Sequence, residues 1–207
     1  EELQQVAAGD SAISIGAGIT LSNLMRILRQ DYSALYDILN VFGSQQIRNL
    51  ATLGGNLGTA SPIGDALPVL MAYGARVVLE SLNGKRELSI DQYFTGYRKT
   101  VRKSDELITN VILPRPQVPA VVKSYKVSKR KDLDIATVSA GFSRTVDDQG
   151  LVASIILAYG GMAERTARAT TAEQFLLGKR WDRSTVEAAM TRIDDDFTPI
   201  SDARAGA

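Results

Sequence analysis

In the first part of this chain, a short run of alternating apolar and polar residues is followed by two runs in which apolar residues recur at helical spacing. The run Ile13–Ala17 alternates and predicts a strand. Behind it, Thr20 is a good N-cap for a helix whose apolar residues recur at helical spacing from 21 to 28. Asp31 can cap a second helix, with apolar residues spaced from 35 to 39. Both apolar stripes are expected to lie in the core, because soluble helices normally bury such a face.

The middle of the chain predicts a helix followed by a β-hairpin. Pro62 stands near the start of a helical apolar run that Gly74 ends. Strand-like runs at 76–81 and 85–90 then flank Asn83-Gly84, which is a strong short-range signal for a hairpin.

A cluster of prolines divides the pattern. Three of the six prolines lie between Pro114 and Pro119, which predicts a boundary between domains at 1–115 and 119–207. The last predicted strand of the first domain lies at 107–113. The second domain is predicted to contain strands at 121–127, 135–146 and 151–159, followed by helices at 170–177 and 183–193. Strands first and helices afterwards indicate the α+β class.

The stretch from Phe42 to Asp65 is rich in glycine and short polar side chains and has almost no charge. Missing Cβ atoms at Gly54, Gly55 and Gly58 would let a ligand approach the backbone, although an ordinary glycine-rich turn feeding a helix has the same composition. Asp65 has two interpretations as well. Its carboxylate can cap the following helix, or it can accept a hydrogen bond from a ligand N–H or hydroxyl group.

Composition changes the picture mainly through two missing residue types. The 207 residues are 44% hydrophobic and 23% charged, and the formal net charge is +1, so nucleic acid is not expected as the main partner. No apolar run is long enough for a membrane helix. The chain has no Cys and no His, which excludes a Ser-His-Asp triad, a Cys/His zinc site and a bound iron–sulfur cluster. Redox chemistry would therefore need a cofactor, and a cytoplasmic location is expected.

Two further features have a structural and a functional interpretation. The charged run 129–134 is typical of a solvated loop, and Trp181 between the last two helices is expected to be a packing anchor. The chain starts at Glu1-Glu2-Leu3 without an initiator Met, so it is expected to be a piece of a longer protein.

Three separated motifs carry a resemblance that spans essentially the whole chain. They are Gln46-Ile47-Arg48-Asn49 with the run 54–65, Gly96-Tyr97-Arg98-Lys99, and Tyr159-Gly160-Gly161-Met162-Ala163. Together they resemble the FAD-binding flavoprotein part of molybdenum hydroxylases, and of xanthine dehydrogenases in particular. The resemblance implies a mixed sheet with helices, as the second FAD-binding subdomain, followed by a small antiparallel sheet with a helical C-terminal part. The family's first FAD-contacting loop, of the type Ala-Gly-Gly-Thr-Asp, has no match in this chain.

The resemblance also implies roles for individual residues. Phe42 matches the aromatic residue against the flavin ring, Asp65 a carboxylate that hydrogen-bonds the cofactor, and Lys126 a basic contact at the flavin. The other matching cofactor contacts are Thr52, Leu53, Gly54, Gly55, Asn56 and Ile108. The charged run 129–134 resembles a loop beside the flavin. No catalytic side chain and no metal ligand is implied.

The function implied is that of an FAD-dependent oxidoreductase component of xanthine dehydrogenase. Electrons would arrive from a molybdenum cofactor and 2Fe-2S clusters in partner domains or subunits, and would pass through FAD to NAD. The alternatives are the flavoprotein component of another molybdenum hydroxylase, acting on an aldehyde, carbon monoxide or an acyl-CoA, or a structural docking module that retains no flavin. This piece alone is expected to be inactive and to hold FAD weakly.

Overall fold

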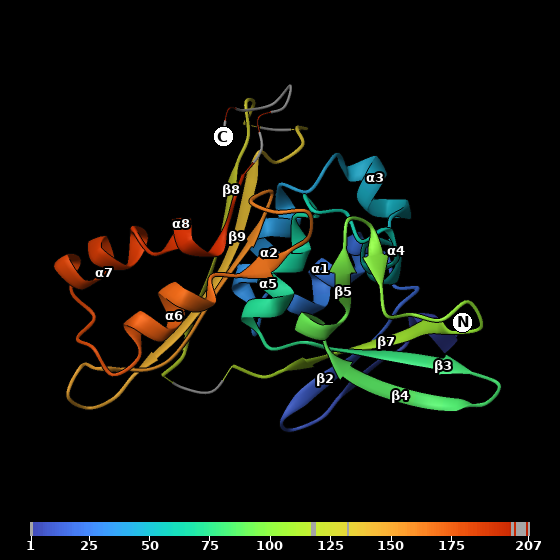
Figure 1. The fold of residues 1–207 in the computed structure, drawn as a ribbon. Helices are drawn as coiled ribbons and strands as arrows, with labels where there is room; N and C mark the ends of the chain where they lie inside the picture. The colour runs from blue at the N-terminus through green and yellow to red at the C-terminus, as the bar shows by residue number, and fades with distance from the viewer. Residues whose placement is uncertain (1, 117–118, 132, 200, 202–205, 207) are drawn as a thin grey trace.

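The computed structural model describes residues 2–116, 119–131, 133–199, 201 and 206. Two antiparallel sheets meet at an angle with helices between them, as Figure 1 shows. Residues 2–116 form a five-stranded sheet with its helices, which is called the five-stranded unit. Residues 119–131 and 133–199 form a four-stranded sheet with its helices, which is called the four-stranded unit. The α+β class is confirmed.

The sheet of the five-stranded unit has the order β1-β2-β7-β3-β4. Its strands are β1 (Val6–Ala8), β2 (Ala12–Gly16), β7 (Leu107–Pro114), β3 (Arg76–Ser81) and β4 (Gly84–Ser89). Every pair in it is antiparallel, so the expectation of a mixed sheet is wrong in this detail. The reason lies in the connections, since Asn83-Gly84 turns β3 directly into its neighbour β4. A short hairpin of β5 (Phe94–Gly96) and β6 (Lys99–Thr100) lies apart from this sheet.

Helices of the five-stranded unit cover one face of its sheet. They are α1 (Leu21–Leu28), α2 (Ser33–Asn40), α3 (Gln45–Leu50), α4 (Leu53–Thr59) and α5 (Ala66–Ala72), with short 3-10 turns at Glu2–Gln4 and Ile90–Gln92. Apolar residues of α1, α2 and α5 form the main core with Ile15, Val77 and Val111 of the sheet. Thr20 caps α1 as expected, by accepting a hydrogen bond from the backbone N–H of Asn23.

The four-stranded unit has the order β11-β10-β9-β8. Its elements are β8 (Val121–Val127), β9 (Val138–Val146), β10 (Val152–Gly160), β11 (Ala167–Arg168), α6 (Thr170–Leu176), α7 (Arg183–Met190) and α8 (Ile193–Asp196). Helices α6 to α8 cover the outer face of this sheet, and a second apolar cluster fills the space beneath them (Figure 1). Trp181 packs against that cluster, and the guanidinium of Arg144 lies 4.7 Å from the centre of its ring.

The two units are joined by close packing of α5 against the inner face of β9 and β10. An added Cβ atom at Gly141 would collide with the backbone of Pro68 and Val69, and one at Gly160 would lie 3.1 Å from the carbonyl oxygen of Pro62. These glycines are therefore needed for the close approach of helix and sheet. The predicted boundary at 115–119 includes residues 117 and 118, which lie outside the described residues.

Asp31 does not cap α2. Its carboxylate forms an ion pair with Arg115 at 2.6 Å, and α2 begins at Ser33 without a side-chain cap. The sequence prediction was wrong because an arginine from the end of β7 competes for the same carboxylate. Among the described residues, no helix is long and apolar enough to cross a membrane.

Candidate cofactor site

The glycine-rich stretch is helical over much of its length. Ser44 caps α3 by accepting from the N–H of Ile47 at 3.2 Å, and Thr52 caps α4 by accepting from the N–H of Gly55 at 3.0 Å. Two short helices, α3 and α4, therefore form within this stretch. A hydroxyl cap satisfies one of the free N–H groups at each start, which helps helices with poor intrinsic propensity to form.

The three glycines of α4 have different surroundings. A Cβ atom at Gly54 would lie 2.6 Å from Cβ of Ala17, and the Gly54 N–H donates to the Ala17 carbonyl at 2.8 Å. Gly54 is therefore required by packing within the protein. Gly55 and Gly58 are exposed, and a Cβ atom at Gly58 would contact only Ile108, at 3.8 Å. The open side of α4 is the side on which a ligand could approach the backbone.

Asp65 and Lys126 form a buried ion pair between the two units. Lys126 comes from β8, and its Nζ lies 2.7 Å from Oδ2 of Asp65, which stands directly before α5. The exposed fractions of the two side chains are 8% for Lys126 and 9% for Asp65. Lys126 also donates to the carbonyl oxygen of Val41 at 3.0 Å. The pair brings together two predicted site residues that are 61 positions apart, and Val41 precedes a third, Phe42.

The Asp65 carboxylate is not a helix cap. No side-chain hydrogen bond to the start of α5 is present, so the capping interpretation is wrong. Its second oxygen, Oδ1, is buried and has no hydrogen-bond partner among the described residues. Burial raises the pKa of Asp65, while the hydrogen bond and charge of Lys126 act to lower it. A buried carboxylate oxygen without a donor is costly, and a ligand N–H or hydroxyl group would remove that cost.

Phe42 is held by an arginine that sequence reasoning did not assign. Arg48 in α3 donates from Nη1 to the carbonyl oxygens of Phe42 at 3.0 Å and of Gly43 at 2.9 Å. Arg48 is part of the motif Gln46-Ile47-Arg48-Asn49, which was the sequence signal that could have identified it as a site residue. The contact ties the backbone at Phe42 to α3, while the Phe42 ring stays partly exposed.

The remaining predicted contacts lie along α4 and the neighbouring strand β7. Leu53 is fully buried in the core, and its backbone N–H donates to the carbonyl oxygen of Ile19 at 3.3 Å. Asn56 has a buried Oδ1 atom without a partner in the described part of the chain. Ile108 is partly buried beside α4. These residues lie along α4 and β7, whereas Asp65, Lys126 and Phe42 belong to a first group around the buried ion pair.

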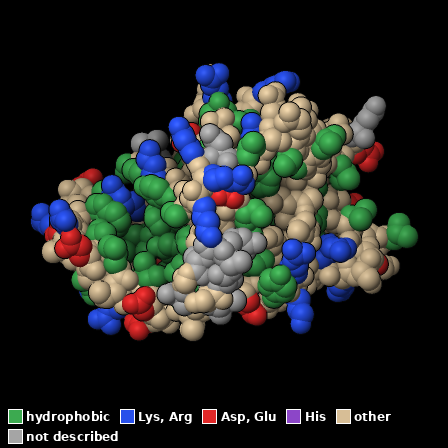
Figure 2. Space-filling view, turned by 90° about the horizontal axis from the view of Figure 1, so that it is seen from above, with side chains coloured by type: hydrophobic (Ala, Val, Ile, Leu, Met, Phe, Trp, Pro, Cys, Tyr) green, Lys and Arg blue, Asp and Glu red, His purple; other side chains and the backbone are tan. Residues whose placement is uncertain are grey.

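Within the charged run 129–134, Arg130 and Asp134 contact each other. Asp134 accepts from the Arg130 N–H at 2.8 Å, and its pKa is lowered chiefly by that hydrogen bond. Residue 132 lies outside the described residues. On the face seen in Figure 2, Lys and Arg side chains are scattered among hydrophobic and neutral groups and do not form one continuous positive surface.

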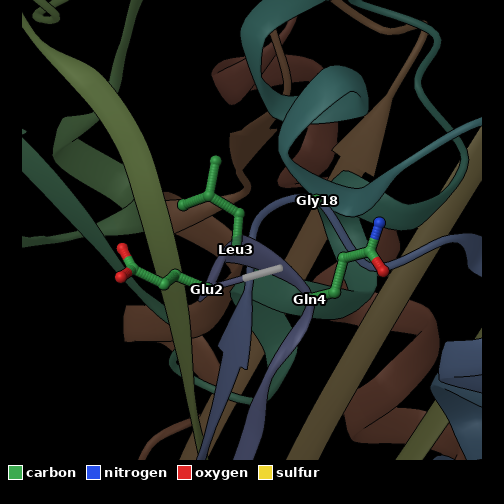
Figure 3. A pocket seen from close by; sticks show the side chains of 4 residues that line it. All are labelled: Glu2, Leu3, Gln4 and Gly18. Atoms are coloured by element: carbon green, nitrogen blue, oxygen red, sulfur yellow. The ribbon is translucent and has the colours of Figure 1, made fainter.

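A hollow of about 640 Å³ lies elsewhere, at the start of the chain. Figure 3 shows that the side chains of Glu2, Leu3 and Gln4 fan outward around it, and Gly18 forms part of its wall. The Gly18 N–H donates to the Leu3 carbonyl at 2.7 Å, so this wall is held by the backbone. None of the predicted site residues lines this hollow.

Two family models match the chain. Residues 1–116 match the FAD binding domain in molybdopterin dehydrogenase, and residues 123–207 match the CO dehydrogenase flavoprotein C-terminal domain. The first match covers more than half of the chain.

Curated relatives and solved structures agree with these models. A xanthine dehydrogenase of Emericella nidulans is 37% identical over 95% of this chain, which spans 15% of that protein. The nicotinate dehydrogenase FAD-subunit of Eubacterium barkeri is 32% identical over 99% of this chain and 71% of its own length. A carbon monoxide dehydrogenase structure from Hydrogenophaga pseudoflava, described as lacking the Mo-pyranopterin moiety of its cofactor, superimposes with a TM-score of 0.92 at 28% identity. The superposition covers 100% of this chain and 71% of the carbon monoxide dehydrogenase chain.

Proposed function

The chain belongs to the FAD-binding flavoprotein family of molybdenum hydroxylases, and from that premise we propose that it is the FAD-holding part of a xanthine dehydrogenase. In this proposal, electrons reach it from molybdenum and iron–sulfur centres in partner domains and leave through FAD to NAD. The 37% identity to a xanthine dehydrogenase over nearly the whole chain supports the choice of enzyme.

The residues present fit a flavin nucleotide. Two buried acceptor atoms, Oδ1 of Asp65 and Oδ1 of Asn56, lack donors in the described part of the chain, and a flavin offers N–H and hydroxyl donors. The half-buried Phe42 offers an aromatic face to a planar ring. The exposed Gly58, beside which only Ile108 lies, would let a ligand approach α4 closely. The orphaned oxygen of Asp65 beside Lys126 is the observation that carries the proposal.

In this function the chain's own residues bind, orient and tune. Bound FAD would supply the electron and hydride transfer. Lys126 would place a positive charge in a water-poor site and would favour electron-rich forms of its ligand. Asp65 would have two tasks, since one oxygen holds Lys126 and the other would accept a hydrogen bond from the ligand. Arg48 would keep Phe42 in place through its carbonyl oxygen.

The test is the flavin content of the whole protein that contains this chain. We expect Asp65→Ala to lose most of the flavin absorbance after desalting and to lose NAD reduction with it. Asp31→Ala is the matched control, because Asp31 also pairs with an arginine, at 2.6 Å, but lies outside the site. Unchanged flavin content and NAD reduction in Asp65→Ala would contradict the proposed site.

The second candidate is the flavoprotein component of a different molybdenum hydroxylase. It is favoured by the nicotinate dehydrogenase FAD-subunit, which matches 99% of this chain. Both candidates use the same FAD site and differ in the organic substrate, which would bind in a partner. Assaying the complete enzyme with hypoxanthine, nicotinate and a panel of aldehydes separates them. A purely structural module remains the third reading, and FAD retained by the wild-type protein after desalting would exclude it.

A further inference from the structure

Two ion pairs join the units, and they lie at opposite edges of the four-stranded sheet. Lys126 on the edge strand β8 pairs with Asp65, and Arg168 on the other edge strand β11 pairs with Asp91. The other ion pairs found among the described residues lie within one unit. The first pair belongs to the proposed flavin site. The second has no role in it so far.

Arg168 is clamped in a way that fixes several elements at once. Its Nη1 lies 2.9 Å from Oδ2 of Asp91, beside the hairpin β5–β6, while Nε and Nη2 bind both carboxylate oxygens of Glu173 in α6. Glu173 also accepts from the backbone N–H of Leu157 in β10 at 2.7 Å. Because a guanidinium is planar and binds carboxylates in fixed directions, this arrangement holds β10, β11 and α6 as one body against Asp91.

Between the two edges, the sheet rests on α5 along its central strands. The contact there is made by glycines, at Gly141 and Gly160, which lie against the backbone at Pro68 and Pro62. Side chains of the sheet pack there as well, since Ala158 of β10 is buried in the main core and Val122 of β8 packs against that core. The ion pairs at the two edges add directional contacts to this apolar packing.

We propose that Arg168 is a positioning residue for the flavin site. By holding β11 to Asp91, it sets the tilt of the four-stranded sheet on α5. The tilt decides where β8 places Lys126 relative to Asp65 and to the carbonyl of Val41. The flavin site is assembled from both units, so its geometry depends on a contact at the far edge of the sheet. This inference rests on the proposed function, because its readout is flavin binding.

The test breaks only the link between the units. In the whole protein, Asp91→Ala removes the partner of Arg168 across the units and leaves the Arg168–Glu173 pair intact. We expect the FAD dissociation constant to rise by about tenfold, which corresponds to about 1.4 kcal/mol, and the flavin absorption band to shift. Asp91→Asn keeps an acceptor oxygen and is expected to fall between wild type and Asp91→Ala. Asp31→Ala is the control and is expected to leave both readouts unchanged.

A double-mutant cycle separates positioning from general stability. If Arg168 acts through Lys126, the effect of Asp91→Ala on the dissociation constant is largely absent in a Lys126→Gln background. An effect that is the same in both backgrounds, or an Asp91→Ala protein with wild-type affinity and an unshifted band, would overturn the inference. Wild-type protein without FAD would instead contradict the proposed function itself, so the two failures are distinguishable.

Discussion

The two ion pairs that join the units differ in how many carboxylate oxygens at each junction have a hydrogen-bond donor. At Arg168, both oxygens of Glu173 are bound, and the guanidinium also reaches Asp91. At Lys126, only one oxygen of Asp65 is bound, and the other is buried without a partner in the described part of the chain. Both carboxylate side chains are well buried, with exposed fractions of 6% for Glu173 and 9% for Asp65. A saturated buried carboxylate indicates a structural role, and one with a spare oxygen indicates a ligand.

The same contrast holds for two glycines of α4. The space beside Gly54 is filled by Ala17, whereas the space beside Gly58 is open apart from Ile108. Composition makes these glycines look alike. Their neighbours separate one that packs within the protein from one that leaves room for a ligand.

Breaking the saturated pair is expected to have the largest effect on stability. Glu173→Ala leaves Arg168 without its bidentate partner and leaves the Leu157 N–H without an acceptor. We expect the free energy of unfolding to fall by about 3–5 kcal/mol, as for other broken buried pairs. Denaturant unfolding measures this. Glu187→Ala is the control, since Glu187 pairs with Arg183 on the exposed side of α7 and should change stability by about 0.5 kcal/mol or less. Equal effects of the two variants would contradict the assignment.

The unsaturated pair is expected to be replaceable without loss of fold. Asp65→Leu alone leaves the Lys126 ammonium buried and should cost about 3 kcal/mol, whereas adding Lys126→Met should recover most of that loss, because apolar groups of similar size replace buried pairs well. The same unfolding experiment compares the single and double variants. A double variant as unstable as Asp65→Leu would show that the pair is needed for the fold.

The glycine contrast gives the next prediction. Gly54→Ala should cost about 1–3 kcal/mol through overpacking against Ala17. Gly58→Ala should be neutral or should stabilise α4 by up to about 1 kcal/mol, because alanine has the higher helix propensity. Thermal unfolding of the two variants checks the difference. Similar midpoints for both would mean that Gly54 is not held by packing.

The smallest effect concerns Glu106, whose ion pair with Arg86 lies within the five-stranded unit. Arg86 and the N–H of Lys103 hold the pKa of Glu106 at about 2, below its ordinary value of 4.5. A lowered pKa in the folded state adds stability above pH 4.5, and this contribution is lost as the pH falls toward 2. The stability difference between wild type and Glu106→Gln should therefore shrink across that window. A difference that does not depend on pH would contradict this explanation.

Local sequence signals predicted most of the elements. The spacing behind Thr20 gave α1, Asn83-Gly84 gave the β3–β4 hairpin, and the predicted strand 121–127 coincides with β8. The same reasoning missed α4, because glycine and asparagine have poor helix propensity, and it missed α3, which is only six residues long. The sequence signals for these helices were the N-cap residues Ser44 and Thr52. Each accepts a hydrogen bond from the backbone N–H three residues later.

The candidate site was harder to predict because its partners are far apart in sequence. Asp65 looked equally suitable as a helix cap, and only Lys126, 61 residues away, decides between the two interpretations. Asp31 failed as a cap for a similar reason, since Arg115 lies 84 residues away. Local pattern shows that a carboxylate is available. The fold decides which donor it meets.

The central claim is that Asp65 and Lys126 serve a flavin more than they serve the fold. Titrating FAD into flavin-free preparations of the wild-type whole protein and of the Asp65→Leu/Lys126→Met double variant tests it most directly. We expect near wild-type unfolding of the double variant together with a loss of FAD affinity of about a hundredfold or more, equivalent to about 2.7 kcal/mol. A double variant that binds FAD as tightly as wild type would contradict the account.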